Sequence, residues 1–244
     1  MENILSVSVS PELIYKVQNL PLITKEDESD FQEHDAEPIK DLETIQKIAS
    51  YYLNRGELRN YALFVTGINV GLRISDLLSL RFKDIFNEDG SVKDHILIKE
   101  KKTRKTNKHR TIGLSKRAEE AIIAYRNSLP KYDPELYIFR NESRAFKYTD
   151  KNTPMTRQGL YTVLDRTWKD LGLTTRHGTH LLRKTFAYQV LTGTNDPFER
   201  SRRLEMLMRM FNHSSIRVTL AYAGISREEE MDLYHSLDFG LQAI

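Results

Sequence analysis

The sequence predicts a mainly α-helical fold with a small three-stranded antiparallel β-sheet, an α+β arrangement. Two observations indicate it. Apolar residues recur three and four positions apart along most of the chain after residue 40, the spacing that places them on one face of a helix. Between residues 81 and 114 this spacing gives way to short runs bounded by turn residues, which are typical of strands.

Helix-ending and helix-starting residues sharpen the helical part of this prediction. Gly71 follows one stretch of helical spacing and marks its end, and Ser115 precedes another as its N-cap. We expect a final helix from about residue 226, with Met231, Leu233, Tyr234 and Leu237 on one side. The expected helices cover residues 41–53, 59–69, 72–80, 116–128, 156–171, 177–192, 199–211, 215–222 and 227–237.

Three strands are expected where the apolar period changes. Residues 81–86, 95–99 and 109–114 have the length and composition of strands, and Asn87-Glu-Asp-Gly90 has the composition of a turn between the first two. The sequence therefore predicts one small antiparallel sheet within a helical body.

Charge divides the chain into an acidic beginning and a basic remainder. Residues 1–37 hold two basic and nine acidic residues, whereas residues 38–244 hold 35 basic and 25 acidic ones. We expect 1–37 to be an acidic segment or linker, and 38–244 to be the folded domain that carries the function. A solvated linker is the simpler interpretation; an acidic strap that shields a basic surface is the alternative. The basic remainder favours a polyanionic partner.

Composition excludes several classes of function. The chain has no cysteine, so it has no disulfide, thiol nucleophile or thiolate metal site. No apolar run approaches the roughly 18 residues needed to span a bilayer, and the start lacks the pattern of a secretory signal. A cytoplasmic location and no membrane partner are expected.

Three short motifs carry side chains suited to phosphate chemistry. They are Gly71-Leu-Arg-Ile-Ser-Asp76, His180-Leu-Leu-Arg183, and the stretch from Asn212-His213 to Tyr222, with a lysine-rich segment between the first and second. In this order and wording they resemble the tyrosine recombinase (phage integrase) family, over about residues 38–238. The resemblance implies that family's catalytic-domain fold and a site-specific DNA recombinase, which cuts and rejoins strands through a covalent 3′-phosphotyrosine.

The resemblance also assigns roles to single residues. Tyr222 is the nucleophile, and it needs activation because a phenol has a reference pKa near 10. Arg73 and Arg183 hold the phosphate, since guanidinium forks match its oxygens and stay charged. His180 hydrogen-bonds the phosphate or accepts the tyrosine's proton, and His213 donates to a non-bridging oxygen. The roles carried over fall on Arg73, Asp76 (an orienting role), His180, Arg183, His213 and Tyr222.

The general acid of this family is a lysine between two strands, and two positions compete for that role. Lys105 matches by its spacing to the following strand, and Lys102 matches by its Lys-Thr dipeptide. Spacing favours Lys105. Ten basic and two acidic residues lie between residues 93 and 117, and a solvated hairpin tip is the plain interpretation of several of them. The expected phosphate contacts in this stretch are Lys101, Lys102, Arg104, Lys108 and Arg110.

Partners and rivals follow from the same resemblance. The implied partner is double-stranded DNA, bound by a homotetramer on two DNA sites that is a monomer in solution, in a bacterium or phage. No cofactor or metal is implied; the His177-Gly-Thr-His180 spacing is the alternative, a zinc site. Family members usually carry a core-binding domain before the catalytic one, which 1–37 does not resemble. The functional rivals are a DNA-binding regulator that no longer cuts, and strand relaxation like that of type IB topoisomerases.

Overall fold

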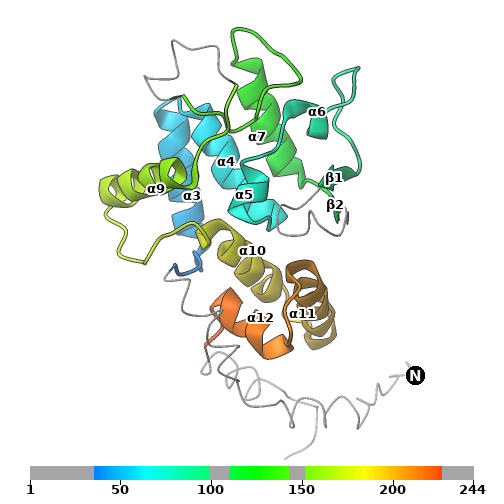
Figure 1. The fold of residues 1–244 in the computed structure, drawn as a ribbon. Helices are drawn as coiled ribbons and strands as arrows, with labels where there is room; N and C mark the ends of the chain where they lie inside the picture. The colour runs from blue at the N-terminus through cyan, green and yellow to red at the C-terminus, as the bar shows by residue number, and fades with distance from the viewer. Residues whose placement is uncertain (1–35, 99–109, 143–151, 227–244) are drawn as a thin grey trace, which may run out of the picture.

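The computed structural model describes residues 36–98, 110–142 and 152–226 (Figure 1). Helices dominate this part of the chain, as predicted. The helix expected at 227–237 lies outside the described residues. The helices are α3 Leu42–Asn54, α4 Leu58–Val70, α5 Ile74–Leu77, α6 Phe82–Ile85, α7 Lys116–Asn127, α9 Arg157–Leu171, α10 Leu181–Thr192, α11 Pro197–Phe211 and α12 Ile216–Ala223.

Short side chains at the helix starts fix several of these bounds. Asp41 accepts a hydrogen bond from the Thr44 backbone N–H at 2.6 Å, and Ser115, as predicted, accepts one from that of Ala118 at 3.3 Å. Each bond satisfies a backbone donor of the first turn that has no partner within the helix. The local sequence therefore starts α3 and α7 at the observed residues.

The sheet among the described residues has two strands rather than the predicted three. β1 (Ile96–Ile98) and β2 (Arg110–Ile112) pair antiparallel, with Ile96 opposite Ile112. The strand predicted at 81–86 is wrong, because this segment contains the helical turn α6. The Asp84 carboxylate accepts from the Arg81 backbone N–H at 2.7 Å and closes that turn.

Helix α4 lies at the centre of the larger hydrophobic core. It contacts α3, α7 and α10, and its Ala62, Leu63 and Phe64 are at most 2% exposed. Gly67 lets α10 approach closely, because a Cβ atom there would lie 2.5 Å from the Leu182 side chain. The core thus fixes where α10 begins, which matters for the site below.

A second, smaller core joins the three C-terminal helices α10, α11 and α12, which lie together below the main body in Figure 1. Its buried members are Ala187, Leu191, Leu207, Phe211 and Ala223. Helix α10 contributes to both cores, since Leu181 and Leu182 belong to the larger one. Helix α10 therefore packs into both cores and joins them.

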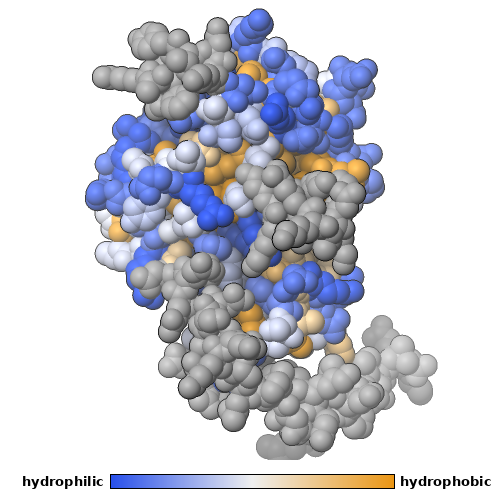
Figure 2. Space-filling view, in the orientation of Figure 1, coloured by the Kyte–Doolittle hydropathy of each residue, from blue (hydrophilic) through white to orange (hydrophobic). Residues whose placement is uncertain are grey.

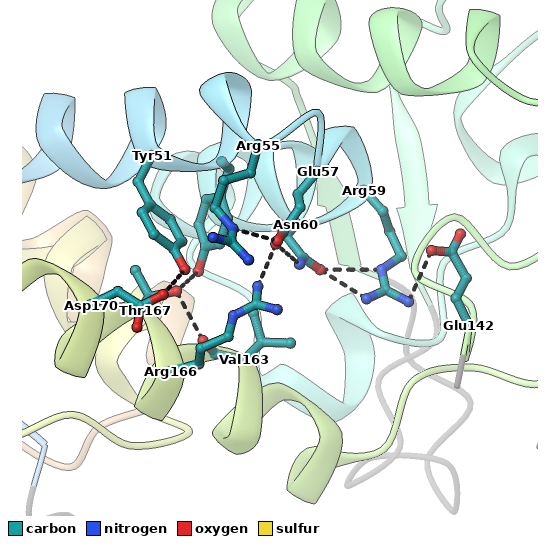
Figure 3. A network of polar contacts seen from close by, with 11 residues as sticks. Tyr51, Arg55, Glu57, Arg59, Asn60, Glu142, Val163, Arg166, Thr167 and Asp170 are labelled. Carbon is teal, nitrogen blue, oxygen red and sulfur yellow. Dashed lines mark hydrogen bonds and ion pairs between the residues drawn. The ribbon is translucent and has the colours of Figure 1, made fainter. Parts of the chain in front are cut away.

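A network of polar side chains fastens α9 to α3 and α4 (Figure 3). The Glu57 carboxylate lies at its centre and accepts from Arg55 Nε at 2.9 Å, Asn60 Nδ2 at 2.7 Å and Arg166 Nη2. Beside it, Tyr51 donates to Asp170 at 2.6 Å. Two of these contacts, Arg166 with Glu57 and Tyr51 with Asp170, join segments more than a hundred positions apart in the sequence, so the network is a structural clamp.

Polar residues cover most of the described surface in the view of Figure 2, and apolar residues appear between them across the middle of this face. Within the described ranges, no helix is both long and apolar enough to cross a membrane.

Candidate active site

The site begins at the N-terminus of α10, where two predicted residues lie one turn apart. His180 is the N-cap residue of this helix, and Arg183 is in its first turn with only 4% of its surface exposed. Buried Leu181 and Leu182 hold this turn in the larger core. Packing therefore sets the direction of both functional side chains.

Arg183 is held by a carbonyl and an aromatic ring. Its Nη1 donates to the Gly71 carbonyl at 2.8 Å, and its guanidinium carbon lies 3.9 Å from the centre of the Phe211 ring. Neither contact neutralises the guanidinium charge, and both restrict its orientation. An arginine held in this way is organised in advance for an anion.

Gly71 makes the first of these contacts possible. Its backbone has φ 59°, in the left-handed region, and a Cβ atom here would lie 2.3 Å from the Phe186 ring. Only glycine meets both conditions without strain. Gly71 ends α4 in a tight turn. In this turn the Gly71 carbonyl faces Arg183, and Arg73 becomes the N-cap residue of α5.

Tyr222 lies on α12, a helix defined at both ends. Ser215 caps its start by accepting from the Val218 N–H at 3.2 Å, and Gly224 ends it with φ 74°. The Tyr222 hydroxyl lies 3.1 Å from His180 Nδ1, across 42 positions of sequence. The tyrosine expected as nucleophile is therefore within hydrogen-bond distance of the histidine expected either to bind the phosphate or to accept its proton.

The hydroxyl is protonated in this environment. Burial raises the pKa of Tyr222 to about 12, against the charge and hydrogen bond of Arg183 and the charge of Arg73, which lower it. At pH 7 a group with that pKa is ionised in roughly one molecule in 10⁵. A hydroxyl with this pKa would need a base in order to act as a nucleophile, and His180 Nδ1 lies within hydrogen-bond distance of it.

His213 reaches the same place from the end of α11. Asn212 ends that helix with φ 57°, a left-handed conformation that asparagine tolerates. The imidazole packs edge-on to Tyr222 at 5.1 Å between ring centres and to Phe211 at 5.3 Å. Its Nδ1 lies 3.1 Å from Thr219 Oγ1.

Thr219 constrains the protonation of this imidazole. Its fully buried hydroxyl donates to the Ser215 carbonyl at 3.2 Å, so its one proton is already used. The hydroxyl oxygen can then accept from His213 Nδ1 when that nitrogen is protonated, and in the imidazolium form both ring nitrogens carry a proton. In that form Nε2 can donate to an anion.

The structure thus brings together five predicted residues from α5, α10, α12 and the end of α11. They are Arg73, His180, Arg183, His213 and Tyr222. Asp76 lies within α5 and is 1% exposed. Both candidates for the general acid and four of the expected phosphate contacts lie outside the described residues: Lys101, Lys102, Arg104, Lys105 and Lys108.

Three residues of the cluster had no role in the sequence prediction. Phe211 lies under Arg183 and beside Tyr222, Lys184 has its Nζ 5.5 Å from the centre of the Tyr222 ring, and Thr219 holds His213. Thr219 lies within the Tyr222 motif, three positions before the tyrosine. Phe211 and Lys184 gave no signal beyond their nearness in sequence to His213 and Arg183.

His177, which the alternative interpretation made a zinc ligand, packs between aromatic rings. Its ring stacks on Tyr161 and packs against Trp168, each 5.3 Å away between centres, and its Nε2 lies 3.6 Å from Asp165. Within the described part of the chain, no group of three His, Asp or Glu side chains is arranged to hold a metal ion.

Comparison with known proteins fits this geometry. Residues 39–229 match the sequence profile of the phage integrase family. The chain belongs to the phage integrase family. It is 34% identical over 201 residues to "Probable integrase/recombinase YoeC" of Bacillus subtilis, covering 82% of this chain and 96% of that protein. It is 26% identical to tyrosine recombinase XerD of Halalkalibacterium halodurans, covering 72% of this chain and 53% of XerD.

Solved structures show the same fold. The XerH site-specific recombinase, in a post-cleavage complex with its palindromic difH substrate, aligns with a TM-score of 0.57 at 20% identity. The alignment covers 83% of this chain and 52% of XerH. This phage integrase family chain therefore spans about half the length of the Xer recombinases that it matches, and nearly all of the B. subtilis relative.

Proposed function

We propose that this protein is a tyrosine recombinase that cuts and rejoins double-stranded DNA through a covalent bond to Tyr222. The contact between the Tyr222 hydroxyl and His180 Nδ1 at 3.1 Å, beside Arg183, carries the proposal. A tyrosine in contact with both a base and a guanidinium has what phosphoryl transfer requires. The family relationship supports the same reaction.

The reaction assigns one task to each described group. The Tyr222 oxygen attacks the scissile phosphorus while its proton passes to His180. Arg73 and Arg183 stabilise the charge that develops on the non-bridging oxygens, and the His213 imidazolium donates to one of them. The bond from phosphorus to the 5′-oxygen breaks, which leaves a 3′-phosphotyrosine and a 5′-hydroxyl.

The leaving 5′-oxygen takes a proton from a lysine, Lys105 by the spacing argument or Lys102 by the dipeptide. The 5′-hydroxyl of a partner strand then attacks the phosphotyrosine, and the tyrosine regains its proton. Because the ester conserves the bond energy, this sequence of steps is balanced without a nucleotide cofactor. Double-stranded DNA as substrate and a homotetramer on two sites are parts of the proposal, as are a domain from residue 38 and a cytoplasmic location.

The test uses duplexes with a nick, from which the cleaved end is lost so that the covalent product accumulates. The protein would be mixed with a randomised pool of such duplexes, and DNA that stays attached in boiling detergent would be captured and sequenced. We expect an adduct with the unmodified chain and none with Tyr222→Phe. Salt-sensitive DNA binding without any adduct would favour the non-cutting regulator and contradict the proposal.

His180→Ala is the second variant for this assay. Loss of a positioned base costs about 10²–10⁴ in rate, so the adduct should form slowly while DNA affinity is retained. A plasmid relaxation assay run alongside separates strand exchange from topoisomerase-like relaxation.

A further inference from the structure

The arginine expected to contact phosphate at the base of the lysine-rich segment is directed into the protein. Arg110 is the first residue of β2, where it pairs with Ile98. Its Nη1 donates to the Met210 carbonyl at 3.2 Å, and its Nη2 is buried from solvent. A buried guanidinium nitrogen is a poor contact for DNA phosphate. The geometry points to another role.

That role begins with the end of α11. The last carbonyls of a helix have no partners within it. Here the Asn212 N–H bonds the Arg209 carbonyl at 3.2 Å, and the His213 N–H bonds the Met208 carbonyl at 3.0 Å. Arg110 supplies a donor to the Met210 carbonyl, from a strand one hundred positions away. Its charge also complements the negative end of the helix dipole.

The consequence concerns His213, which lies three positions after Met210. His213 follows the left-handed residue Asn212, which directly continues the final turn of α11. Arg110 connects this final helical turn to β2 through its hydrogen bond to the Met210 carbonyl. The segment just before β2 contains both candidates for the general acid. One guanidinium thus links the His213 turn to the base of the lysine-bearing hairpin.

We propose that Arg110 is a positioning residue, which fixes the turn carrying His213 against the β1–β2 base, rather than a phosphate contact. This rests on the proposed function, because positioning matters through the reaction that His213 serves. A guanidinium is suited to the task, since it stays charged and can hold a carbonyl at a fixed angle.

DNA binding separates this role from a phosphate contact. Each phosphate contact adds about 0.9 to the slope of log affinity against log salt. Arg110→Gln should therefore keep the slope of the unmodified chain, whereas Arg104→Gln, at an expected phosphate contact, should lower it by about that amount. A slope lowered equally by Arg110→Gln would overturn the proposal.

Cleavage on the nicked duplex measures the positioning directly. A misplacement of about 1 Å can cost about 10²-fold in rate, so at saturating protein Arg110→Gln should slow adduct formation by about 10- to 100-fold. Arg126→Gln is the matched control, because Arg126 Nη1 also donates to a backbone carbonyl, that of Gly90 at 3.1 Å. The control should leave the rate unchanged.

A double-mutant comparison ties the loss to His213. If Arg110 acts through His213, combining Arg110→Gln with His213→Ala should slow cleavage no more than His213→Ala alone. The pH dependence of the residual rate should also change in Arg110→Gln. Multiplied effects with an unchanged pH profile would show a merely structural role and overturn the proposal.

Two further arms keep the result decisive. Arg110→Lys retains one charged donor, so it should recover part of the rate; it also serves if Arg110→Gln does not fold. If the unmodified chain forms no adduct, the proposed function fails. The positioning role of Arg110 is then tested by NMR of the histidine rings. The His213 signals should then shift in the Arg110 variant and stay in Arg126→Gln; unchanged His213 signals would contradict the link.

Discussion

Two arginine-rich clusters in this molecule use the same side chain for different purposes. Around Glu57, on the clamp between α3, α4 and α9, Arg55 and Arg166 bind a carboxylate (Figure 3). At the start of α10, Arg183 is instead held by the Gly71 carbonyl and the Phe211 ring, beside the Tyr222 hydroxyl. In the first cluster the arginines bind a carboxylate, and in the second the Arg183 guanidinium also lowers the pKa of a tyrosine hydroxyl by its charge and hydrogen bond.

The difference shows in the pKa of each central group. For Glu57, burial raises the pKa, but hydrogen bonds from Arg55 and Asn60 and the charge of Arg166 outweigh burial and lower it. For Tyr222, burial prevails over the charge of Arg183, and the pKa rises to about 12. The clamp thus favours the charged state in the resting protein, whereas the site keeps its nucleophile neutral until a base takes the proton.

Arg183→Lys should slow cleavage more than any other variant considered below. It tests whether the two arginine clusters differ in function. Lysine keeps the charge but loses the planar fork, so adduct formation should fall by about 10²–10³-fold, the size seen when one transition-state donor is removed. The measurement is the single-turnover rate on the nicked duplex. Arg59→Lys is the control, because Arg59 Nη1 donates to the Arg140 carbonyl at 3.0 Å within the clamp. Equal losses of cleavage in both variants would contradict the distinction.

Glu57→Gln should affect stability and not chemistry. Glutamine keeps one acceptor oxygen but replaces the other with a donor amide, so at least one partly buried donor loses its acceptor, and the free energy of unfolding should fall by about 1–3 kcal/mol. Urea unfolding at neutral pH measures this. The cleavage rate of the folded protein should stay the same, and a slowed rate would count against a purely structural clamp.

The same variant predicts a pH dependence. The folded pKa of Glu57 lies below its ordinary value of 4.5, so its contribution is present above that pH and is lost as pH falls through the lowered pKa. The stability difference between the unmodified chain and Glu57→Gln should therefore shrink on acidification below 4.5. A difference that is constant with pH would show that the charge of Glu57 contributes nothing.

Thr219→Val should give the smallest effect and sharpen the account of His213. The change keeps the side-chain shape but removes the oxygen that accepts from His213 Nδ1. We expect about a 10-fold slower cleavage with a changed pH profile, at the lower end of the range for a hydrogen bond from a charged group. Thr167→Val, which removes the 2.8 Å contact with Tyr52 in the clamp, is the matched control and should leave the profile unchanged.

The sequence predicted those features that depend on local chemistry. The cap at Ser115 and the end of α4 at Gly71 each depend on a few adjacent residues. The same motifs named the five residues that the structure brings together. The identity and order of the residues in these motifs, rather than their apolar periodicity, carried that information.

The sequence missed one local turn and several contacts between distant segments. Residues 81–86 have strand-like composition, yet Asp84 closes a helical turn, and Phe82 and Ile85 lie in the core, both 0% exposed. The contacts of Arg110 with Met210 and of Arg183 with Phe211 join segments that are far apart in sequence. A single sequence does not contain these pairings, because packing selects them.

The most direct test of the whole account is to locate the DNA on the protein. The covalent product would be digested with a protease and a nuclease, and the peptide that retains a nucleotide would be sequenced by mass spectrometry. The account predicts a 3′-linked nucleotide on Tyr222, in the peptide that follows Arg217. A nucleotide on any other residue, or a 5′-linkage, would contradict it.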